Sequence, residues 1–256
     1  MIGASALLIV VAAAGLLAYN YVLGETKPAS SPITAVPLVV DAATPVPEPV
    51  VAEATAESVT AAPESSTESA AAQVQGSGLL LFEISSDGSE VSFNIYEELA
   101  GQPKTVVGTT DQVAGQIAIN LSDLSQSEVG VIQVNARTFV TDNDRRNNAI
   151  RRFILSTDQY EFITFTPMEI IGLSGSAEPG QSFTFQIAGD LTIRDVTQPV
   201  VFDVTVQGDS TTQLTGTATT VVARSDFNLT IPSVPNVANV GEEVTLTIDF
   251  VAQTAG

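Results

Sequence analysis

Four of the chain's nine lysines and arginines lie within eight consecutive residues, and this cluster is the clearest candidate for chemistry. Its members are Arg145, Arg146, Arg151 and Arg152. A planar guanidinium can donate two parallel hydrogen bonds to a phosphate or a carboxylate, so the cluster is a candidate site for an anionic head group. The alternative is that these arginines pair with surface carboxylates and hold their own segment in place. The sequence leaves both possibilities open.

Other residue types that carry chemistry are missing. The chain contains no histidine and so lacks the commonest general base and metal ligand. It contains no cysteine, which excludes a disulfide, a thiolate metal site and a thiol nucleophile. The spacing of Asp142 and Asp144 resembles a calcium loop, but Asn147 and Phe153 stand where such a loop needs glycine and glutamate. We therefore expect no metal site.

Two pairs of neighbouring carboxylates remain as candidates for catalysis: Glu97 with Glu98, and Glu242 with Glu243. Both pairs fall in or beside segments of strand character. Adjacent residues on a strand point to opposite faces, so neither pair can act together on one substrate. We expect that the protein is not an enzyme and needs no cofactor.

The overall charge excludes two classes of partner. The formal net charge is −20, with 29 acidic and 9 basic residues. Nucleic-acid binding needs clustered cations to neutralise phosphates, so nucleic acid is not an expected partner. The same charge would repel an anionic bilayer, which argues against peripheral electrostatic attachment to a membrane.

The elements that must position these residues are mostly β-strands. From Gly78 to the end of the chain, apolar and polar residues alternate with the period of a half-buried strand. The clearest runs are 91–96, 183–188, 202–207 and 244–251, and further strand segments are 79–84, 105–109, 113–121, 129–136, 161–171 and 212–224. We expect an all-β domain over 78–256 with roughly eight to ten antiparallel strands, and alternation alone does not distinguish a sandwich from a closed barrel.

One segment, 141–155, interrupts the strand pattern and contains the arginine cluster. Asp142 or Asp144 is a suitable N-cap for a helix. Ile150, Phe153 and Ile154 have the spacing of an apolar helical stripe. We expect one short helix that covers an end of the sheet.

The first 23 residues are almost wholly apolar and contain no charged side chain. A helix from Ile2 to Leu23 would span about 33 Å, which is enough to cross a hydrocarbon core of about 30 Å. Tyr19 and Tyr21 would then lie at the headgroup level. A cleaved signal peptide is the alternative, but the segment has no basic n-region and no clear cleavage site. We expect a single-pass anchor over 1–23.

Residues 24–77 have the composition of a disordered linker. They contain seven prolines, seven acidic residues, one lysine and no aromatic residue. Such a segment cannot bury enough apolar surface to offset its ordering entropy. We expect a flexible acidic linker between the anchor and the β domain.

Several short motifs, in the same order as in a known family, give this β domain a resemblance to the YceI-like domain, also called the lipid or polyisoprenoid-binding domain. The most specific is Gly189–Val200, G-D-L-T-I-R-D-V-T-Q-P-V, which is similar to the family's G-x-L-T-[IL]-x-G-V-T-[RK]-P-V. One departure is Glu161, which stands where the family has a proline. The other similar segments are Ser92–Ile95, Val107–Thr109, Val113–Ile117, Thr141–Arg151, Tyr160–Phe165 and Arg224–Phe227.

The resemblance, which covers about residues 79–253, implies an eight-stranded antiparallel barrel of lipocalin-like shape with an elongated apolar cavity. It also implies an isoprenoid or related amphiphile as ligand and a location in the periplasm or at the cell surface. Taken singly, each candidate for the cavity wall fits an ordinary core residue better than a ligand contact, and only as a set do the candidates define a site. The candidates are Phe93, Ile95, Phe165, Phe183, Phe185, Leu191, Phe202, Val204, Phe227, Leu246 and Ile248.

The sequence thus supports two hypotheses. The first is a membrane-tethered, extracytoplasmic protein that holds a polyisoprenoid or similar amphiphile, with Arg145, Arg146, Arg151 and Arg152 as head-group candidates. The protein would be secreted if the N-terminus were cleaved, and it could form a dimer. The second is a stalked cell-surface interaction module with a filled interior and no ligand cavity.

Overall fold

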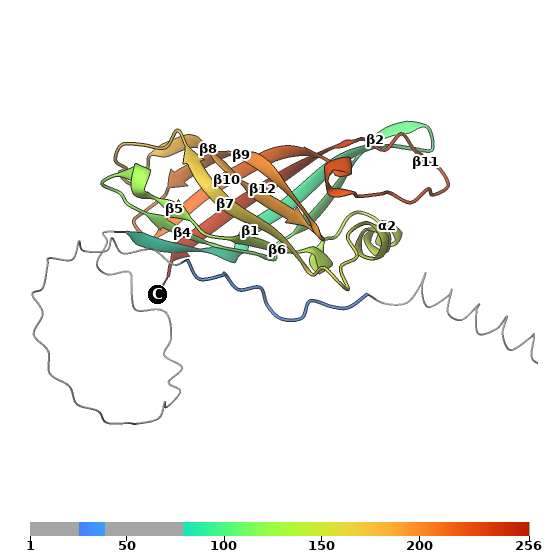
Figure 1. Ribbon diagram of the computed structural model, residues 1–256, viewed down its shortest axis with the longest axis horizontal. Coiled ribbons are helices and arrows are strands. Elements are labelled where there is room, and N and C mark those ends of the chain that lie inside the picture. The colour runs from blue at the N-terminus through green and yellow to red at the C-terminus, as the bar shows by residue number, and fades with distance from the viewer. Residues whose placement is uncertain (1–25, 39–78, 256) are drawn as a thin grey trace, which may run out of the picture.

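The alternating runs form strands that bury one face each, and these strands make a single strongly curled antiparallel sheet (Figure 1). The computed structural model describes residues 26–38 and 79–255. The strands are β1 (Leu80–Leu99), β2 (Gln102–Thr110), β3 (Val113–Ala114), β4 (Gln116–Ile119), β5 (Glu128–Val129), β6 (Ile132–Asn135), β7 (Phe162–Ile171), β8 (Ser182–Ile193), β9 (Val196–Gly208), β10 (Gln213–Ala223), β11 (Val237–Ala238) and β12 (Glu243–Thr254).

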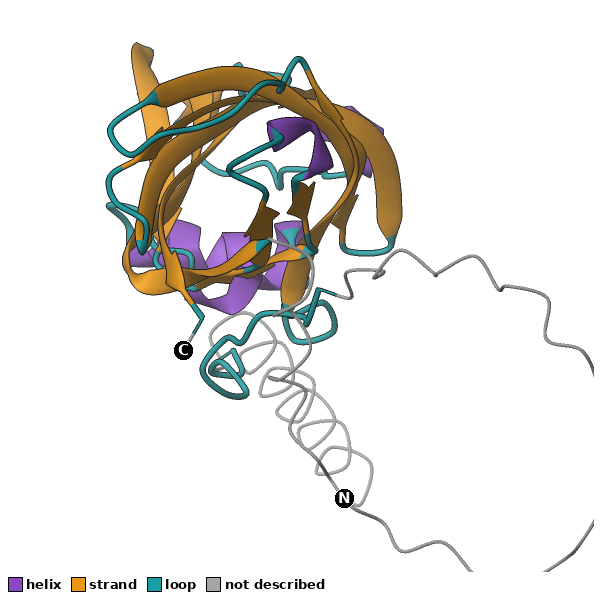
Figure 2. Cartoon of the chain, turned by 90° about the vertical axis from the view of Figure 1, so that its left-hand side faces the viewer, coloured by secondary structure: helices purple, strands orange, loops and turns teal. Residues whose placement is uncertain are grey.

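The sheet curls round on itself and encloses an interior (Figure 2). The hydrogen-bonded order is β3-β6-β7-β8-β9-β10-β12-β1-β4-β5, and β2 and β11 also pair with β1. β1 pairs with β12 along one edge, and with β4 and β2 along the other. The run that holds β2, β3 and β4 is joined in turn to β5 and β6. The all-β antiparallel prediction is confirmed, and the fold is barrel-like.

The number of strands differs from the sequence prediction. Residues 79–255 form twelve strands, whereas roughly eight to ten were expected from alternation. Bends divide the predicted strand over 113–121 into β3 and β4, and the one over 129–136 into β5 and β6. In addition, the predicted strands over 79–84 and 91–96 are joined in β1, and β11 was not predicted. Alternation of side chains continues through such bends and does not reveal them.

The interior is filled largely by phenylalanine and β-branched side chains from all sides of the sheet. Phe165 of β7 and Phe202 of β9 meet edge to face, with ring centroids 4.9 Å apart. Gly189 of β8 makes room for this contact, because a Cβ there would lie 2.4 Å from the Thr166 carbonyl oxygen and 2.8 Å from the Phe165 ring. Burying one such side chain contributes about 1.5–3 kcal/mol.

The helical segment differs in detail from the expectation. It consists of the α-helix α2 (Asp144–Ala149) and the π-helix η3 (Ile150–Ile154). Asn143 is the N-cap, in place of Asp142 or Asp144: its side-chain oxygen accepts hydrogen bonds from the backbone N–H groups of the next two arginines. The wider π turn brings Leu155 into the core and leaves Phe153 36% exposed, so the predicted apolar stripe is wrong at that residue.

Residues 26–38, which we name the strap, lie extended along the outside of the sheet (Figure 1). The Lys27 N–H donates to an Asp158 side-chain oxygen at 2.8 Å. At the other end the Leu38 N–H donates to the Gln116 side-chain oxygen at 2.7 Å. The prediction of disorder over 24–77 therefore does not hold for these thirteen residues. The rest of that linker, and the predicted anchor over 1–23, lie outside the described residues.

Glu161 is the main attachment point of the strap. Its Oε1 accepts from the Ser30 N–H at 2.7 Å and from the Ser30 hydroxyl at 3.0 Å. Its Oε2 lies 2.7 Å from Nη1 of Arg137, and the same guanidinium nitrogen donates to the Pro28 carbonyl at 3.0 Å. Asn135, which is fully buried, donates a further hydrogen bond to the carboxylate. A proline at 161, as in the family pattern, would supply none of these contacts.

The pKa of Glu161 predicts how the strap responds to acid. Burial of the carboxyl favours its neutral form, but hydrogen bonds from Ser30 and Asn135 and the charge of Arg137 lower the pKa below its ordinary value. A lowered folded-state pKa stabilises the contact above the ordinary glutamate pKa, and this stability is lost as the pH falls through the folded value. We expect hydrogen-exchange protection of the Ser30 amide to decline as the pH falls below the ordinary pKa of a glutamate.

The Leu38 amide is the matched control for this experiment, because its acceptor, the Gln116 side chain, does not titrate. NMR-detected exchange, corrected for intrinsic rates, should show the Leu38 amide still protected where the Ser30 amide is not. Loss of both amides together, or loss near neutral pH, would contradict the role given to Glu161.

Across the described ranges, no helix is both long enough and apolar enough to cross a lipid bilayer.

Candidate ligand cavities

Among the described residues, two cavities lie inside the curled sheet, one toward each of its ends. The larger has a volume of about 570 Å³ and lies at the end that carries α2 and η3. The smaller has a volume of about 130 Å³ and lies at the opposite end, beside β4 and β5. We call them the large cavity and the small cavity.

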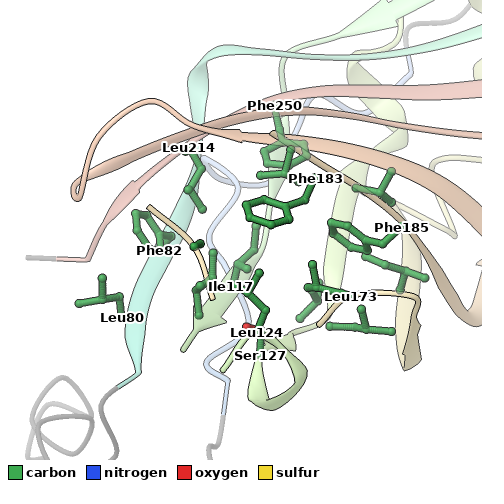
Figure 3. A pocket seen from close by; sticks show the side chains of 18 of the residues that line it. Leu80, Phe82, Ile117, Leu124, Ser127, Leu173, Phe183, Phe185, Leu214 and Phe250 are labelled. Carbon is green, nitrogen blue, oxygen red and sulfur yellow. The ribbon is translucent and has the colours of Figure 1, made fainter. Parts of the chain in front are cut away.

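The small cavity is lined almost entirely by apolar side chains (Figure 3). Phe82, Phe183 and Phe250 converge on it from β1, β8 and β12, Leu124 approaches from the 3-10 helix η1 (Leu124–Gln126), and Leu173 from the loop after β7. The polar side chains in its lining, such as Ser127, Gln181 and Thr211, belong to loops or lie beside a strand end. Such a wall fits a hydrocarbon chain and offers little to a polar group.

The large cavity combines an apolar floor with a charged rim. Phe93, Val106 and Leu246 form part of the floor. One side of the mouth is α2 with η3, and the other is the loop between η4 (Arg224–Phe227) and β12. From 229 to 235 this loop is apolar except for Thr230 and Ser233. Its apolar residues Ile231 and Val234 line the cavity. A ligand with a polar end and an apolar body would match this distribution.

A layer of buried side chains separates the two cavities. On β8, Ile187 lines the small cavity and Ile193 the large one, while Leu191 between them lines neither. Val91 of β1 and Thr220 of β10 have the same intermediate position. All three are less than 9% exposed. The single elongated cavity implied by the resemblance is therefore divided in two, with buried residues of three strands that line neither part.

An ion-pair network stands at the rim of the large cavity. Nη2 of Arg146 lies 2.9 Å from Oε1 of Glu97, which is 6% exposed, and Nη1 pairs with Asp142. Asp142 also accepts from Nζ of Lys104 at 2.6 Å. The hydrogen bond from Lys104, together with the charge of Arg146, lowers the pKa of Asp142. The network fixes α2 against β1 and β2 across the mouth.

The structure distributes the four clustered arginines over different environments. Arg145 and Arg146 line the large cavity, whereas Arg151 and Arg152 line neither cavity. Arg151 donates to the Phe139 carbonyl at 3.4 Å and to the Asn148 side chain at 3.2 Å. Arg146 is already paired with carboxylates. Within the described residues the guanidinium of Arg145 makes no hydrogen bond or ion pair, so it is the arginine best able to bind an anion.

The predicted cavity residues also separate into groups. Leu191 and Phe227 line neither cavity and belong to the packed core, at 3% and 1% exposure. Phe93, Ile95 and Leu246 line the large cavity. Six line the small cavity: Phe165, Phe183, Phe185, Phe202, Val204 and Ile248.

Sequence reasoning missed Arg224 and the loop that it holds. Its guanidinium donates to the carbonyl oxygens of Gly241 and Leu229, both at 3.1 Å, and lies 3.0 Å from Glu242. These contacts fasten the two ends of the loop that forms one side of the large cavity. Arg224 is the first residue of the R-S-D-F motif, but the motif alone gave no sign of which groups it would bind.

Of the two neighbouring carboxylate pairs, Glu97 and Glu98 lie on β1. Glu97 points into the large cavity, whereas Glu98 accepts a hydrogen bond from the exposed Tyr96 hydroxyl at 3.4 Å on the outer face. The two adjacent side chains therefore face opposite ways, as the strand period predicted. In the part of the chain that the structure describes, no group of three or more histidine, cysteine or acidic residues could hold a metal ion.

Comparison with known proteins identifies the fold. The family model described as YceI-like domain matches residues 82–252. The chain belongs to the YceI-like domain family. The match includes every strand from β2 to β11 and most of β1 and β12. A comparison with curated proteins finds no match.

Two solved structures resemble this YceI-like chain. A polyisoprenoid binding domain from Saccharophagus degradans, implicated in plant cell wall breakdown, has a TM-score of 0.54 and 14% identity, and the alignment covers 69% of this chain and 99% of that one. BcnA from Burkholderia cenocepacia has a TM-score of 0.52 and 19% identity, with 66% and 99% covered. At these identities the likeness shows the YceI-like fold.

Proposed function

We propose that this YceI-like protein is a membrane-tethered, extracytoplasmic lipid-binding protein that holds a polyisoprenoid or a similar amphiphile inside its barrel. The observation that carries the proposal is the large cavity, which joins an apolar floor to a cationic rim. Its volume of about 570 Å³ falls within the range of about 300–1,000 Å³ that is usual for small-molecule sites. The structure from Saccharophagus degradans, described as a polyisoprenoid binding domain, supports the same ligand class.

The scaffold for this function is an eight-stranded lipocalin-like barrel. β2, β3 and β4 count as one bent strand, and β5 and β6 as another. With the two-residue β11 left aside, eight strands surround the interior. A barrel of that size has room for one small ligand.

The ligand lies with its apolar body in the large cavity and its charged end at the rim. Arg145 is the first contact for the head group, because its guanidinium is not engaged by another described residue. Arg146 serves as a second, fixed cation, held in place by Glu97 at 2.9 Å. A longer chain would reach the small cavity once Leu191 and its neighbours in the separating layer moved aside.

The energetics favour carriage of a lipid over its extraction. Burying a hydrocarbon chain is worth about 0.8 kcal/mol for each CH₂ moved from water. A lipid that comes from a bilayer has already gained this free energy there. The barrel therefore exchanges the ligand with a membrane at little net cost, which suits a carrier or a reservoir.

The apolar run from Ile2 to Leu23 is the proposed anchor, with residues 78–256 outside the cytoplasm. Its length, its lack of charge and its two terminal tyrosines support a membrane span. Cleavage of this segment would release the same lipid-binding domain into solution.

Replacing Arg145 with glutamine tests the head-group assignment. We expect affinity for a C15 prenyl phosphate, measured by calorimetry on the full chain, to fall at least tenfold, since a hydrogen bond to a charged group contributes about 1.5–3 kcal/mol. Affinity for the corresponding prenyl alcohol should not change. Arg145→Lys is the matched control and should retain part of the affinity for the phosphate. If the parent protein bound neither ligand, the proposed function would be wrong.

A filled interior was the expectation of the alternative hypothesis, a stalked interaction module. The two cavities do not fit it.

A further inference from the structure

The strap fixes which end of the barrel lies next to the N-terminal segment. Lys27 is bound to Asp158, in the turn that follows η3 at the large-cavity end. Leu38 lies over Gly130 and binds Gln116, beside residues that line the small cavity. The strap therefore runs along the barrel from the large-cavity end to the small-cavity end, as the blue segment in Figure 1 shows.

The chain between the apolar run and the strap is very short. The run ends at Leu23 and the first strap contact is at Lys27, so three residues separate them. Leu23 and Lys27 are four residue steps apart, so their Cα atoms lie at most about 14 Å from each other. A membrane that held the apolar run would therefore lie close to the large-cavity end of the barrel. Residues 39–78 follow the strap in sequence, so they do not lengthen the connection between the apolar run and the barrel.

The charge of the barrel is distributed unevenly along the same axis. Every lysine and arginine of residues 79–255 lies on the half that contains the large cavity, at Lys104, Arg137, Arg145, Arg146, Arg151, Arg152, Arg194 and Arg224. The small-cavity end carries Asp123, Glu128, Glu178 and Asp209 and none of these cations. At the large-cavity end, carboxylates pair with four of the eight cations, which are Lys104, Arg137, Arg146 and Arg224. This polarity directs the acidic end away from an anionic surface.

Exposed apolar side chains surround the large cavity as well. Leu99 and Val234, which are 36% and 43% exposed, stand in its lining. Tyr96, Val140 and Phe153 are exposed on segments directly next to it. An apolar rim interspersed with arginines suits the headgroup region of a bilayer, where such side chains bury their apolar parts and keep their charge hydrated.

We infer that the large-cavity end of the barrel rests against the surface of the lipid bilayer that holds residues 2–23. The strap and the rim together hold the barrel end-on, with the mouth of the large cavity open to the membrane. This inference rests on the proposed anchor, and it replaces a domain on a long flexible stalk with one docked on the bilayer. A lipid then enters the cavity without crossing water.

The absence of cysteine from the chain makes a direct test possible. Ser233→Cys places a single thiol on the exposed loop at the large-cavity mouth, and Ser176→Cys places one on an exposed loop at the opposite end. Each full-length variant is labelled with a donor dye and reconstituted into phosphatidylcholine–phosphatidylglycerol vesicles that contain a rhodamine-labelled lipid. The two sites are separated by roughly 30 Å along a barrel of tilted strands of about this length.

We expect strong energy transfer from position 233 and weak transfer from position 176. Ser30→Pro removes the N–H that donates to Glu161 without altering the barrel, and Glu161→Ala removes the acceptor; each should bring the two efficiencies closer together. Circular dichroism of both variants establishes that the barrel is folded. In these variants an unchanged difference would show that the strap does not orient the barrel.

Two results overturn the inference. Equal energy transfer from both positions in the parent chain would show that the barrel has no preferred orientation on the membrane. Failure of the chain to float with vesicles would show that residues 2–23 do not anchor it. Titration of the same labelled protein with prenyl phosphate keeps the two proposals apart: binding that persists while the efficiencies are equal overturns the orientation and leaves the lipid-binding function intact.

Discussion

Replacing Phe227 with alanine should destabilise the protein by roughly 3–5 kcal/mol, the usual cost of removing a buried phenylalanine. Phe227 is 1% exposed and belongs to η4, where it packs into the core and lines neither cavity. The removed ring leaves an empty space that the surrounding strands cannot close. Urea unfolding of the full chain, followed by circular dichroism, measures the loss.

Phe153→Ala is the matched control for this prediction. Phe153 is 36% exposed on η3, so its truncation should cost less than about 1 kcal/mol. An equal cost for both substitutions would show that Phe227 is not the packed core residue described above. Because Phe227 stands apart from the cavities, its variant should also bind prenyl phosphate with unchanged affinity wherever the barrel remains folded.

Filling the large cavity should abolish ligand binding without unfolding the barrel. Ala149 is the last residue of α2 and lines this cavity. A tryptophan at this position would occupy space that the ligand needs, and would do so in a void large enough to accept it. We expect Ala149→Trp to lower the affinity for prenyl phosphate at least tenfold in calorimetry and to change the free energy of unfolding by less than about 1.5 kcal/mol.

Ala238→Trp provides the comparison, since Ala238 is exposed on β11 and outside both cavities. It should bind prenyl phosphate like the parent. Undiminished binding by Ala149→Trp would place the ligand elsewhere, with the small cavity as the next candidate. The corresponding substitution there is Ala218→Trp, because Ala218 of β10 lines the small cavity.

The all-β fold could be predicted from the sequence because burial of one sheet face imposes a two-residue period on every strand. Phe93, Phe185 and Leu246 follow this period and do point inward. The division of the interior could not be predicted. Whether Leu191 packs in the core or lines a cavity depends on the side chains opposite it. Two residues of the same separating layer, Val91 and Thr220, are distant from it in sequence.

The strap illustrates a different limit. Its composition predicts disorder, because three of its thirteen residues are prolines and none is aromatic. The order comes instead from acceptors more than 75 residues away, at Asp158, Glu161 and Gln116. The one available signal was the glutamate at 161 in place of the family's proline, and its meaning appeared only with its partners.

The arginine cluster shows why a charged motif is not yet a site. All four residues are arginines of one short segment. Arg145 and Arg146 lie in the α-helix α2, however, and Arg151 and Arg152 lie in the π-helix η3 that begins after Ala149. Arg146 is held by Glu97, Arg151 binds the Phe139 carbonyl, and Arg145 faces the mouth of the large cavity. The different roles of these arginines follow from the helix type and from the position of Glu97.

The most direct test of a lipid-binding barrel is native mass spectrometry of the full chain purified from its own membranes, combined with solvent extraction of the same sample. We expect a protein species with one bound amphiphile, and a prenyl or similarly long hydrocarbon chain in the extract. The Ala149→Trp protein, prepared in parallel, should carry none. A parent protein without any hydrophobic ligand, together with an experimental structure whose interior is filled by side chains, would contradict the account.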